Sequence, residues 1–175
     1  MATVYFRPVS PSEAPKAAAH ALLEQVLQIS PEALIYDPAG KPHLSGGPEF
    51  SLSHTRGGAV LAVDQAPVGV DAELIRPISP SLPKRTLSQR EYAWFIARGA
   101  RPEDFFTLWT LKESYYKFLG TGLPGIPNQT AFCLHKDRWQ LPGAPCRFDT
   151  WGKNLLRIAL CSHAQQVEFV TISEN

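Results

Sequence analysis

The sequence predicts an α+β protein of two similar α/β halves, related by a pseudo-twofold duplication, with antiparallel sheets packed on helices. Three observations support this fold class. Segments 16–29 and 105–119 carry apolar residues at helical spacing. Each is followed by a group of three short apolar segments with turn residues between them, within 50–73 and 146–172. A proline-rich connector at 75–83 marks the best internal boundary.

In the first half, a strand is expected at 3–8, where a β-prone run is ended by proline. A helix is expected at 16–29, because this Ala-rich segment has helical periodicity and ends before a Ser-Pro pair. Residues 37–48 are rich in Pro and Gly and are expected to be a loop. Short turns join three further strands, which predicts an antiparallel meander of 50–53, 59–63 and 68–73.

The second half begins with a helix at 88–97, where Ser88 and Glu91 have the spacing of a capping box. A stronger helix is expected at 105–119, with Gly120 at the C-terminal cap. Its apolar side is expected to hold Phe105, Leu108, Trp109, Tyr116 and Leu119. The remaining strands are expected at 131–134, 146–151, 155–160 and 167–172.

The two groups have the same order of strands and turns, at similar spacing. We therefore interpret them as a degenerate duplication with halves 1–76 and 77–175 and a cleft between them. Aligning the third strand of each group places Asp71 and Glu73 opposite apolar residues, so one half alone would carry the acids. Two unrelated meanders would share the same rhythm, and this alternative stays open.

Composition narrows the class of protein. The chain has 175 residues, of which 44% are hydrophobic and 19% charged, as in globular proteins. A formal charge of +1 argues against bulk attraction to nucleic acid or membranes. No apolar run reaches the ~20 residues of a membrane helix, and the start lacks a signal-peptide pattern. The three cysteines are widely separated and odd in number, which predicts free thiols and a cytoplasmic location.

Three carboxylates carry the clearest chemical signal. Asp71 and Glu73 are two apart on a predicted strand and so share a face. Glu113 and Lys117 are four apart on a predicted helix and so are neighbours. Three acids beside a lysine predict a Mg²⁺ site next to a phosphate-binding cation. The plainer alternatives are surface acids on a strand and an exposed helix ion pair.

Ser53 and His54 stand at the end of the predicted strand 50–53, and Arg56 and two glycines follow them. Hydroxyl, imidazole and guanidinium groups can bind a phosphate, and the glycines let the backbone approach it, so this segment suits phosphate recognition. For His54 alone, a purely structural hydrogen bond is the simpler interpretation.

These segments resemble the motifs of the phosphopantetheinyl transferase superfamily. The signature pair is Gly-Val-Asp-Ala-Glu at 69–73 and Trp-Thr-Leu-Lys-Glu-Ser-Tyr-Tyr-Lys at 109–117. Upstream, Phe-Ser-Leu-Ser-His-Thr at 50–55 is similar to the family's Ser-His motif, and Gly-Lys-Pro at 40–42 to its Gly-Lys-Pro. The strand-rich tail and apparent duplication resemble the monomeric surfactin-synthetase-activating type, which binds coenzyme A between two similar α+β halves.

The resemblance implies a reaction. Asp71, Glu73 and Glu113 would hold Mg²⁺ against the pyrophosphate of coenzyme A, and Lys117 would neutralise phosphate charge. Glu113, or a water on the metal, would take the proton from a carrier-protein serine. The serine would receive the phosphopantetheine arm, and adenosine 3′,5′-bisphosphate would leave.

The resemblance also implies a nucleotide site and partners. Lys41, Ser53 and His54 would contact the phosphate end of coenzyme A. Few basic residues precede Lys41, so a weaker hold on coenzyme A than in larger members is expected. The acceptor would be an acyl or peptidyl carrier protein, served by a monomer without nucleic-acid or membrane partners. Such carriers are typically acidic, so a basic stretch is a candidate docking surface, with a solvated helix face as the alternative. It comprises Lys84, Arg85, Arg90, Arg98 and Arg101.

Two other functions were weighed. A Mg²⁺-dependent nuclease also uses clustered acids, but the lysine expected two residues after Glu73 is replaced by Ile75. A non-catalytic module that binds coenzyme A or a carrier protein would be expected to have lost at least one of the three acids.

Overall fold

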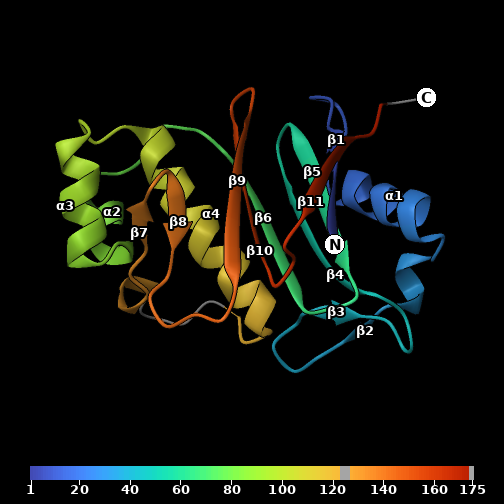
Figure 1. The fold of residues 1–175 in the computed structure, drawn as a ribbon. Helices are drawn as coiled ribbons and strands as arrows, with labels where there is room; N and C mark the ends of the chain where they lie inside the picture. Colours follow the sequence, from blue (N-terminus) through green and yellow to red (C-terminus); the bar gives the residue numbers. More distant parts are fainter. Residues whose placement is uncertain (123–126, 174–175) are drawn as a thin grey trace.

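The computed structural model describes residues 1–122 and 127–173, which form two β-sheets between two helical layers (Figure 1). The first sheet has the order β11-β1-β5-β4 and the second the order β6-β10-β9. The strands of the first sheet are β1 (Ala2–Pro8), β4 (Glu49–Thr55), β5 (Gly58–Asp64) and β11 (Val167–Thr171). Those of the second are β6 (Val68–Leu74), β9 (Arg147–Lys153) and β10 (Leu156–Ser162). Short hairpins are formed by β2 (Ile35–Tyr36) with β3 (Pro42–His43), and by β7 (Cys133–His135) with β8 (Arg138–Gln140).

The layers follow from strands that are apolar on both faces. In β5, Val60 and Ala62 belong to the core between the two sheets, whereas Leu61 packs toward helix α1 (Pro15–Leu27). In β10, Leu160 faces the core between the sheets, and Cys161 belongs to the core under helix α4 (Pro102–Leu119). Because successive side chains of a strand alternate between its faces, such strands require cover on both sides.

The prediction of two meanders was wrong about the pairing of the third strand in each group. The strands β4 and β5 form an antiparallel hairpin, but β6 leaves them and pairs with β10 of the second sheet. In the same way β9 and β10 pair, whereas β11 crosses over and lies parallel to β1. Turn length fixes where a strand ends but not which sheet it joins. Since β1 already occupies the free edge of β5, β6 completes the second sheet and faces the first with Val68, Val70 and Ala72.

One element order occurs twice, although not in the alignment predicted. Strand, helix, short hairpin and long hairpin occur in this order in β1, α1, β2–β3, β4–β5, and again in β6, α4, β7–β8, β9–β10, with α2 and α3 inserted between β6 and α4. This order matches β6 with β1 instead of β11. Tyr5 and Asp71 are each the fourth residue of their strand and face the fourth residue of the partner strand, Leu61 and Ala159. The predicted division at residue 76 stays a prediction, and residues 123–126 and 174–175 of its second half lie outside the described residues.

The predicted helices are confirmed with small shifts in their ends. The helix α3 (Gln89–Ala97) begins with the predicted capping box of Ser88 and Glu91. The helix α4 ends at Gly120, which has the left-handed φ of 69°. Leu119 is 44% exposed, so its placement on the apolar face was wrong. The short helix α2 (Ser81–Thr86) and the strand β8 lie in segments where no element was predicted.

All three cysteines are free thiols in the structure, as expected. Over residues 1–122 and 127–173, none of the helices has both the length and the apolar character that a membrane span requires.

Candidate active site

The strand β6 and the helix α4 lie unusually close together, and Gly69 makes this approach possible. A Cβ atom at Gly69 would lie 2.0 Å from the carbonyl oxygen of Ser114 and 2.3 Å from the amide nitrogen of Phe118. Asp71 and Glu73 have the same strand parity as Gly69, so they share the face of β6 that α4 covers. A glycine two residues before the acids is therefore what brings the strand carboxylates to the helix.

Asp71 is the central side chain of the site. The residue is 5% exposed, and its Oδ1 accepts hydrogen bonds from Lys117 Nζ at 2.7 Å and from Ser53 Oγ at 2.9 Å. Among the described residues, its buried Oδ2 has no hydrogen-bond partner. A buried carboxylate oxygen without a donor is costly, and a cation at that oxygen would compensate for it.

Two serine hydroxyls join the neighbouring edges of the two sheets. Ser51 Oγ accepts the amide N–H of Val70 at 3.0 Å, and Ser53 Oγ accepts that of Ala72 at 3.2 Å. Ser53 is buried and also donates to Asp71. In this structure it therefore orients the carboxylate of Asp71, and its predicted contact with a phosphate stays a prediction.

Glu113 lies half-buried on α4, near Asp71. Burial, followed by repulsion from Asp71, raises the pKa of Glu113 to about 7, and Lys117 partly opposes this shift. A carboxylate with a pKa near neutrality exchanges a proton readily at the working pH of most enzymes. This electrostatic property makes Glu113 a candidate general base.

Glu73 is the third predicted acid, and its Oε2 pairs with Arg76 Nη1 at 3.0 Å. Within the part of the chain that the structure describes, no three His, Cys, Asp or Glu residues are already gathered as a metal site. The oxygen-only donor set and the unpartnered Oδ2 of Asp71 nevertheless suit a hard cation such as Mg²⁺. Asp71 and Glu113 offer oxygen donors of the right kind, whereas Glu73 would have to exchange Arg76 for the ion.

A cavity of about 260 Å³ lies beside these groups. It brings Lys41 of the Gly-Lys-Pro segment together with Glu113, Tyr116 and Lys117 of α4. The remaining lining residues are Ala39, Gly40, Pro42, Ser51, Leu52, Gly120 and Gly122. The ammonium group of Lys41 donates to the carbonyl of Val68 at 3.4 Å, and burial lowers its pKa. The cavity thus combines two cations and a carboxylate with apolar walls.

His54 is exposed and is not among the residues that line this cavity. Desolvation lowers its pKa, and the charges of Lys117, His20 and Lys16 lower it further. The ammonium groups of Lys16 and Lys117 therefore place positive charge near His54.

The predicted basic docking stretch contains one group of ion pairs. Asp104 binds Arg98 Nε at 3.2 Å and Arg101 Nη2 at 2.8 Å, so its single negative charge offsets part of their positive charge. Lys84, Arg85 and Arg90 are exposed.

Sequence reasoning missed Gly69, Ser51 and Tyr116 as parts of the site. Gly69 stands in the quoted motif, and a glycine inside an apolar strand is itself a signal of close backbone approach. Ser51 carries no comparable signal, since its role depends on which strand lies beside β4.

Comparison with known proteins identifies the family. The model of the 4′-phosphopantetheinyl transferase superfamily matches residues 67–165, which include the β6 acids and all of α4. The chain belongs to this superfamily. The predicted enzyme class, a phosphopantetheinyl transferase, is thereby confirmed, as is the resemblance on which it rested.

Individual transferases agree with this assignment. The chain is 31% identical to the 4′-phosphopantetheinyl transferase psf-1 of Bacillus pumilus over 86% of its own length and 71% of that protein. It is 35% identical to the transferase gsp of Aneurinibacillus migulanus over 69% of its length and 55% of that protein. For the transferase Sfp of Bacillus subtilis, the identity is 33%, with 76% and 64% covered. The chain thus spans just over half to about seven tenths of these transferases.

Among solved structures, the Thermotoga maritima holo-[acyl-carrier-protein] synthase is similar at a TM-score of 0.48 and 23% identity, over 55% of this chain and 61% of that one.

Proposed function

We propose that this chain transfers the 4′-phosphopantetheine arm of coenzyme A to a serine of an apo acyl or peptidyl carrier protein. The observation that supports this most directly is the partly buried Asp71–Lys117 pair next to Glu113, at a cavity that Lys41 also lines. Cations that can bind a pyrophosphate, a carboxylate that can accept a proton and an acidic metal-binding oxygen thus occur in one place. Phosphoryl transfer requires this combination.

The metal would be Mg²⁺, held by Asp71 and Glu113 together with Glu73. When bound, it would offset negative charge on the pyrophosphate and on the leaving phosphate. The Ser53 hydroxyl keeps Oδ1 of Asp71 in place, so that its free Oδ2 remains directed for coordination.

In the transfer step, Glu113 would accept a proton and Lys117 would neutralise phosphate charge. The serine oxygen of the carrier attacks the β-phosphorus of coenzyme A, and its proton passes to the carboxylate of Glu113. The bond between the β-phosphorus and the bridging oxygen breaks, so adenosine 3′,5′-bisphosphate leaves with that oxygen. Lys117 stands beside Asp71 and neutralises charge on the phosphates during this step.

The remaining cations would bind the nucleotide. Lys41 lies at the cavity and is placed to hold a phosphate there, and His54 would contact the phosphate end from the basic surface near α1. The weak hold expected from the short N-terminal half is partly offset by Lys16, whose positive charge lies near His54.

The acceptor partner would dock near the exposed Lys84, Arg85 and Arg90, which suit an acidic carrier. We propose a monomer that acts in the cytoplasm, in keeping with its free thiols.

Mass spectrometry tests the function directly. The protein is incubated with coenzyme A, Mg²⁺ and several apo carrier proteins, including fatty-acid, polyketide and peptidyl carriers. We expect at least one carrier to gain a single phosphopantetheine, and the same carrier with its acceptor serine changed to alanine to gain none. Binding of coenzyme A without transfer to any carrier would favour the non-catalytic module, and cleavage of nucleic acid would favour the nuclease.

A further inference from the structure

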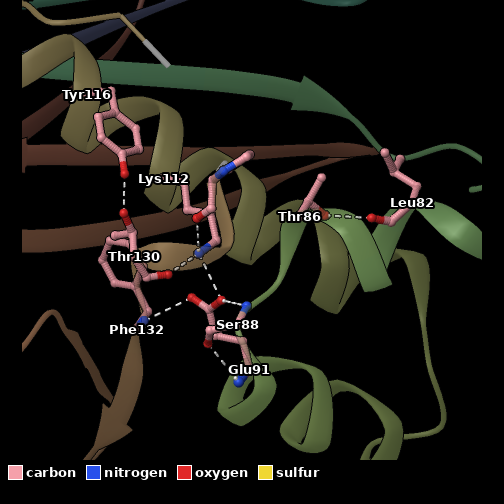
Figure 2. Close-up of polar contacts among 9 residues, drawn as sticks. Leu82, Thr86, Ser88, Glu91, Lys112, Tyr116, Thr130 and Phe132 are labelled. Carbon is pink, nitrogen blue, oxygen red and sulfur yellow. Dashed lines mark hydrogen bonds and ion pairs between the residues drawn. The ribbon is translucent and has the colours of Figure 1, made fainter. Parts of the chain in front are cut away.

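A lysine is completely buried in the helix that carries the site. Lys112 precedes Glu113, and its side chain is 0% exposed. Its Nζ lies 2.8 Å from Oε2 of Glu91, whose side chain is equally buried (Figure 2). A charge pair so far from water persists only where its other hydrogen-bonding groups are also satisfied, so the surroundings of this pair are constrained.

Both members of the pair bind backbone groups of the segment that follows α4. Lys112 Nζ donates to the carbonyl oxygens of Pro127, at 3.2 Å, and of Thr130. Glu91 accepts the amide N–H of Phe132 at 2.9 Å through its other oxygen. The ion pair therefore fixes the backbone of residues 127–132 against α4 (Figure 2).

Thr130 passes this restraint on to the cavity. Its backbone oxygen binds Lys112, and its hydroxyl is hydrogen-bonded to the hydroxyl of Tyr116 (Figure 2). Tyr116 lies one turn after Lys112 and lines the cavity with Glu113 and Lys117. A ring whose hydroxyl is held at a buried threonine has one preferred orientation and forms a fixed wall.

We propose that Tyr116 contacts the bound coenzyme A as an apolar wall of the cavity, and that Thr130, held by the Lys112–Glu91 pair, is the positioning residue that orients this wall. The proposal rests on the proposed function, because it takes coenzyme A as the occupant of the cavity. Tyr116 offers a flat apolar surface in the cavity that Glu113 and Lys117 also line, and it suits a non-phosphate part of the ligand.

Loss of the Tyr116–Thr130 hydrogen bond should weaken the binding of coenzyme A and leave the rate of the transfer step unchanged. Removing the Tyr116 hydroxyl leaves the Asp71–Lys117 pair and Glu113 untouched, since none of their hydrogen bonds involves it. A group that contributes equally to the ground state and the transition state changes KM and leaves kcat unchanged. We expect Tyr116→Phe and Thr130→Val each to raise KM and Kd for coenzyme A about threefold to tenfold, as for one net hydrogen bond.

The experiment compares five variants with the wild-type chain. Tyr116→Phe, Thr130→Val and their double variant remove the same contact, so the double variant should match the single ones. Thr130→Ser keeps the hydroxyl and should restore the wild-type KM. Tyr115→Phe is the matched control, because no hydrogen bond of its hydroxyl is found within the described residues. Kinetics use the carrier that the wild type modifies, and titration calorimetry gives Kd for coenzyme A.

Wild-type transfer together with unchanged KM and Kd in Tyr116→Phe would overturn this inference and leave the proposed function standing. Additive effects in the double variant, or a fall in kcat alone, would also overturn it. If the wild type transfers nothing but still binds coenzyme A, the Kd values decide the inference without the reaction. If the wild type does not bind coenzyme A, the inference fails with the proposed function.

Discussion

Lys117 on α4 and Asp71 on β6 form a hydrogen-bonded ion pair, with 2.7 Å between Nζ and Oδ1. The pair forms only because the helix packs against the strand. The second oxygen of Asp71 is buried and has no hydrogen-bond partner in the part of the chain that the structure describes. The carboxylate is thus fixed by a cation on one oxygen and open to a ligand on the other.

Asp71→Asn tests the importance of this carboxylate. The amide keeps the shape of the side chain but removes the charge that pairs with Lys117 and would bind a metal. We expect turnover to fall about a hundredfold or more, as for other lost electrostatic contacts at a reacting centre. Steady-state transfer to a carrier measures the loss. The exposed Asp137→Asn, in the β7–β8 hairpin turn, is the control and should retain full activity, while circular dichroism verifies that both variants fold.

Glu113→Gln should change how stability depends on pH. The pKa of Glu113 is about 7 in the folded state, above the ordinary glutamate value of 4.5. The protonated carboxyl therefore stabilises the fold at low pH. This stability is fully present below the unfolded pKa and is lost as the pH rises through about 7. In metal-free protein the variant should therefore match the wild type near pH 4 and exceed it near pH 8, on the order of 1 kcal/mol after solvent screening. Urea unfolding at both values measures the difference, and an equal offset at both would contradict the expectation.

Mg²⁺ affinity should rise with pH. The metal binds the deprotonated carboxylate, so binding must release the proton that Glu113 holds below about pH 7. We expect an increase of up to about tenfold per pH unit below that pKa, and less above it. Calorimetry in two buffers of different ionisation enthalpy detects the released proton. Removal of Mg²⁺ by a chelator should abolish transfer. Affinity that stays constant between about pH 5.5 and about pH 7 would exclude Glu113 as a ligand.

Gly69→Ala should separate α4 from β6. The added Cβ would meet backbone atoms of Ser114 and Phe118, which cannot move aside as a flexible side chain could. Overpacking of this kind costs about 1–3 kcal/mol and sometimes more. The matched control is Gly152→Ala, also in a strand, where the nearest atom is the end of the Arg157 side chain at 3.1 Å. Thermal unfolding should show a loss for the first variant only, accompanied by reduced transfer.

Lys112→Met should be the most destabilising of these changes. It leaves the carboxylate of Glu91 buried without its cation, which typically costs about 3–5 kcal/mol. Adding Glu91→Gln removes the unpaired charge, so the double variant should recover part of the loss. Chemical unfolding of the two single variants and the double variant gives the coupling free energy. Strictly additive losses would mean that the pair does not interact.

Local patterns predicted much of this structure. The two-residue spacing of Asp71 and Glu73, the capping box at Ser88 and the glycine cap at Gly120 all act over a few residues, and the corresponding strand and helices are confirmed. Gly-Lys-Pro was recognised by resemblance, and the structure brings Lys41 to the same cavity as Glu113.

Long-range features escaped prediction for physical reasons. A lysine beside a glutamate on a helix normally suggests two exposed charges, and only the distant partner Glu91 explains why Lys112 is buried. Ser53 was predicted to bind a phosphate, and this role stays a prediction. Its hydrogen bonds with Asp71 and Ala72 could not be foreseen, because they depend on the position of β6, which the meander prediction had placed in the wrong sheet.

The parallel pairing of β11 with β1 joins Ala2 to Val167. During synthesis, this edge of β1 can close only after residues 167–171 have emerged. Contacts between such distant residues slow folding, because a large loop must close before they form. Meanwhile an open strand edge is a site for association with other chains. The edge of β1 that β11 later covers is thus exposed to such association until β11 has been synthesised.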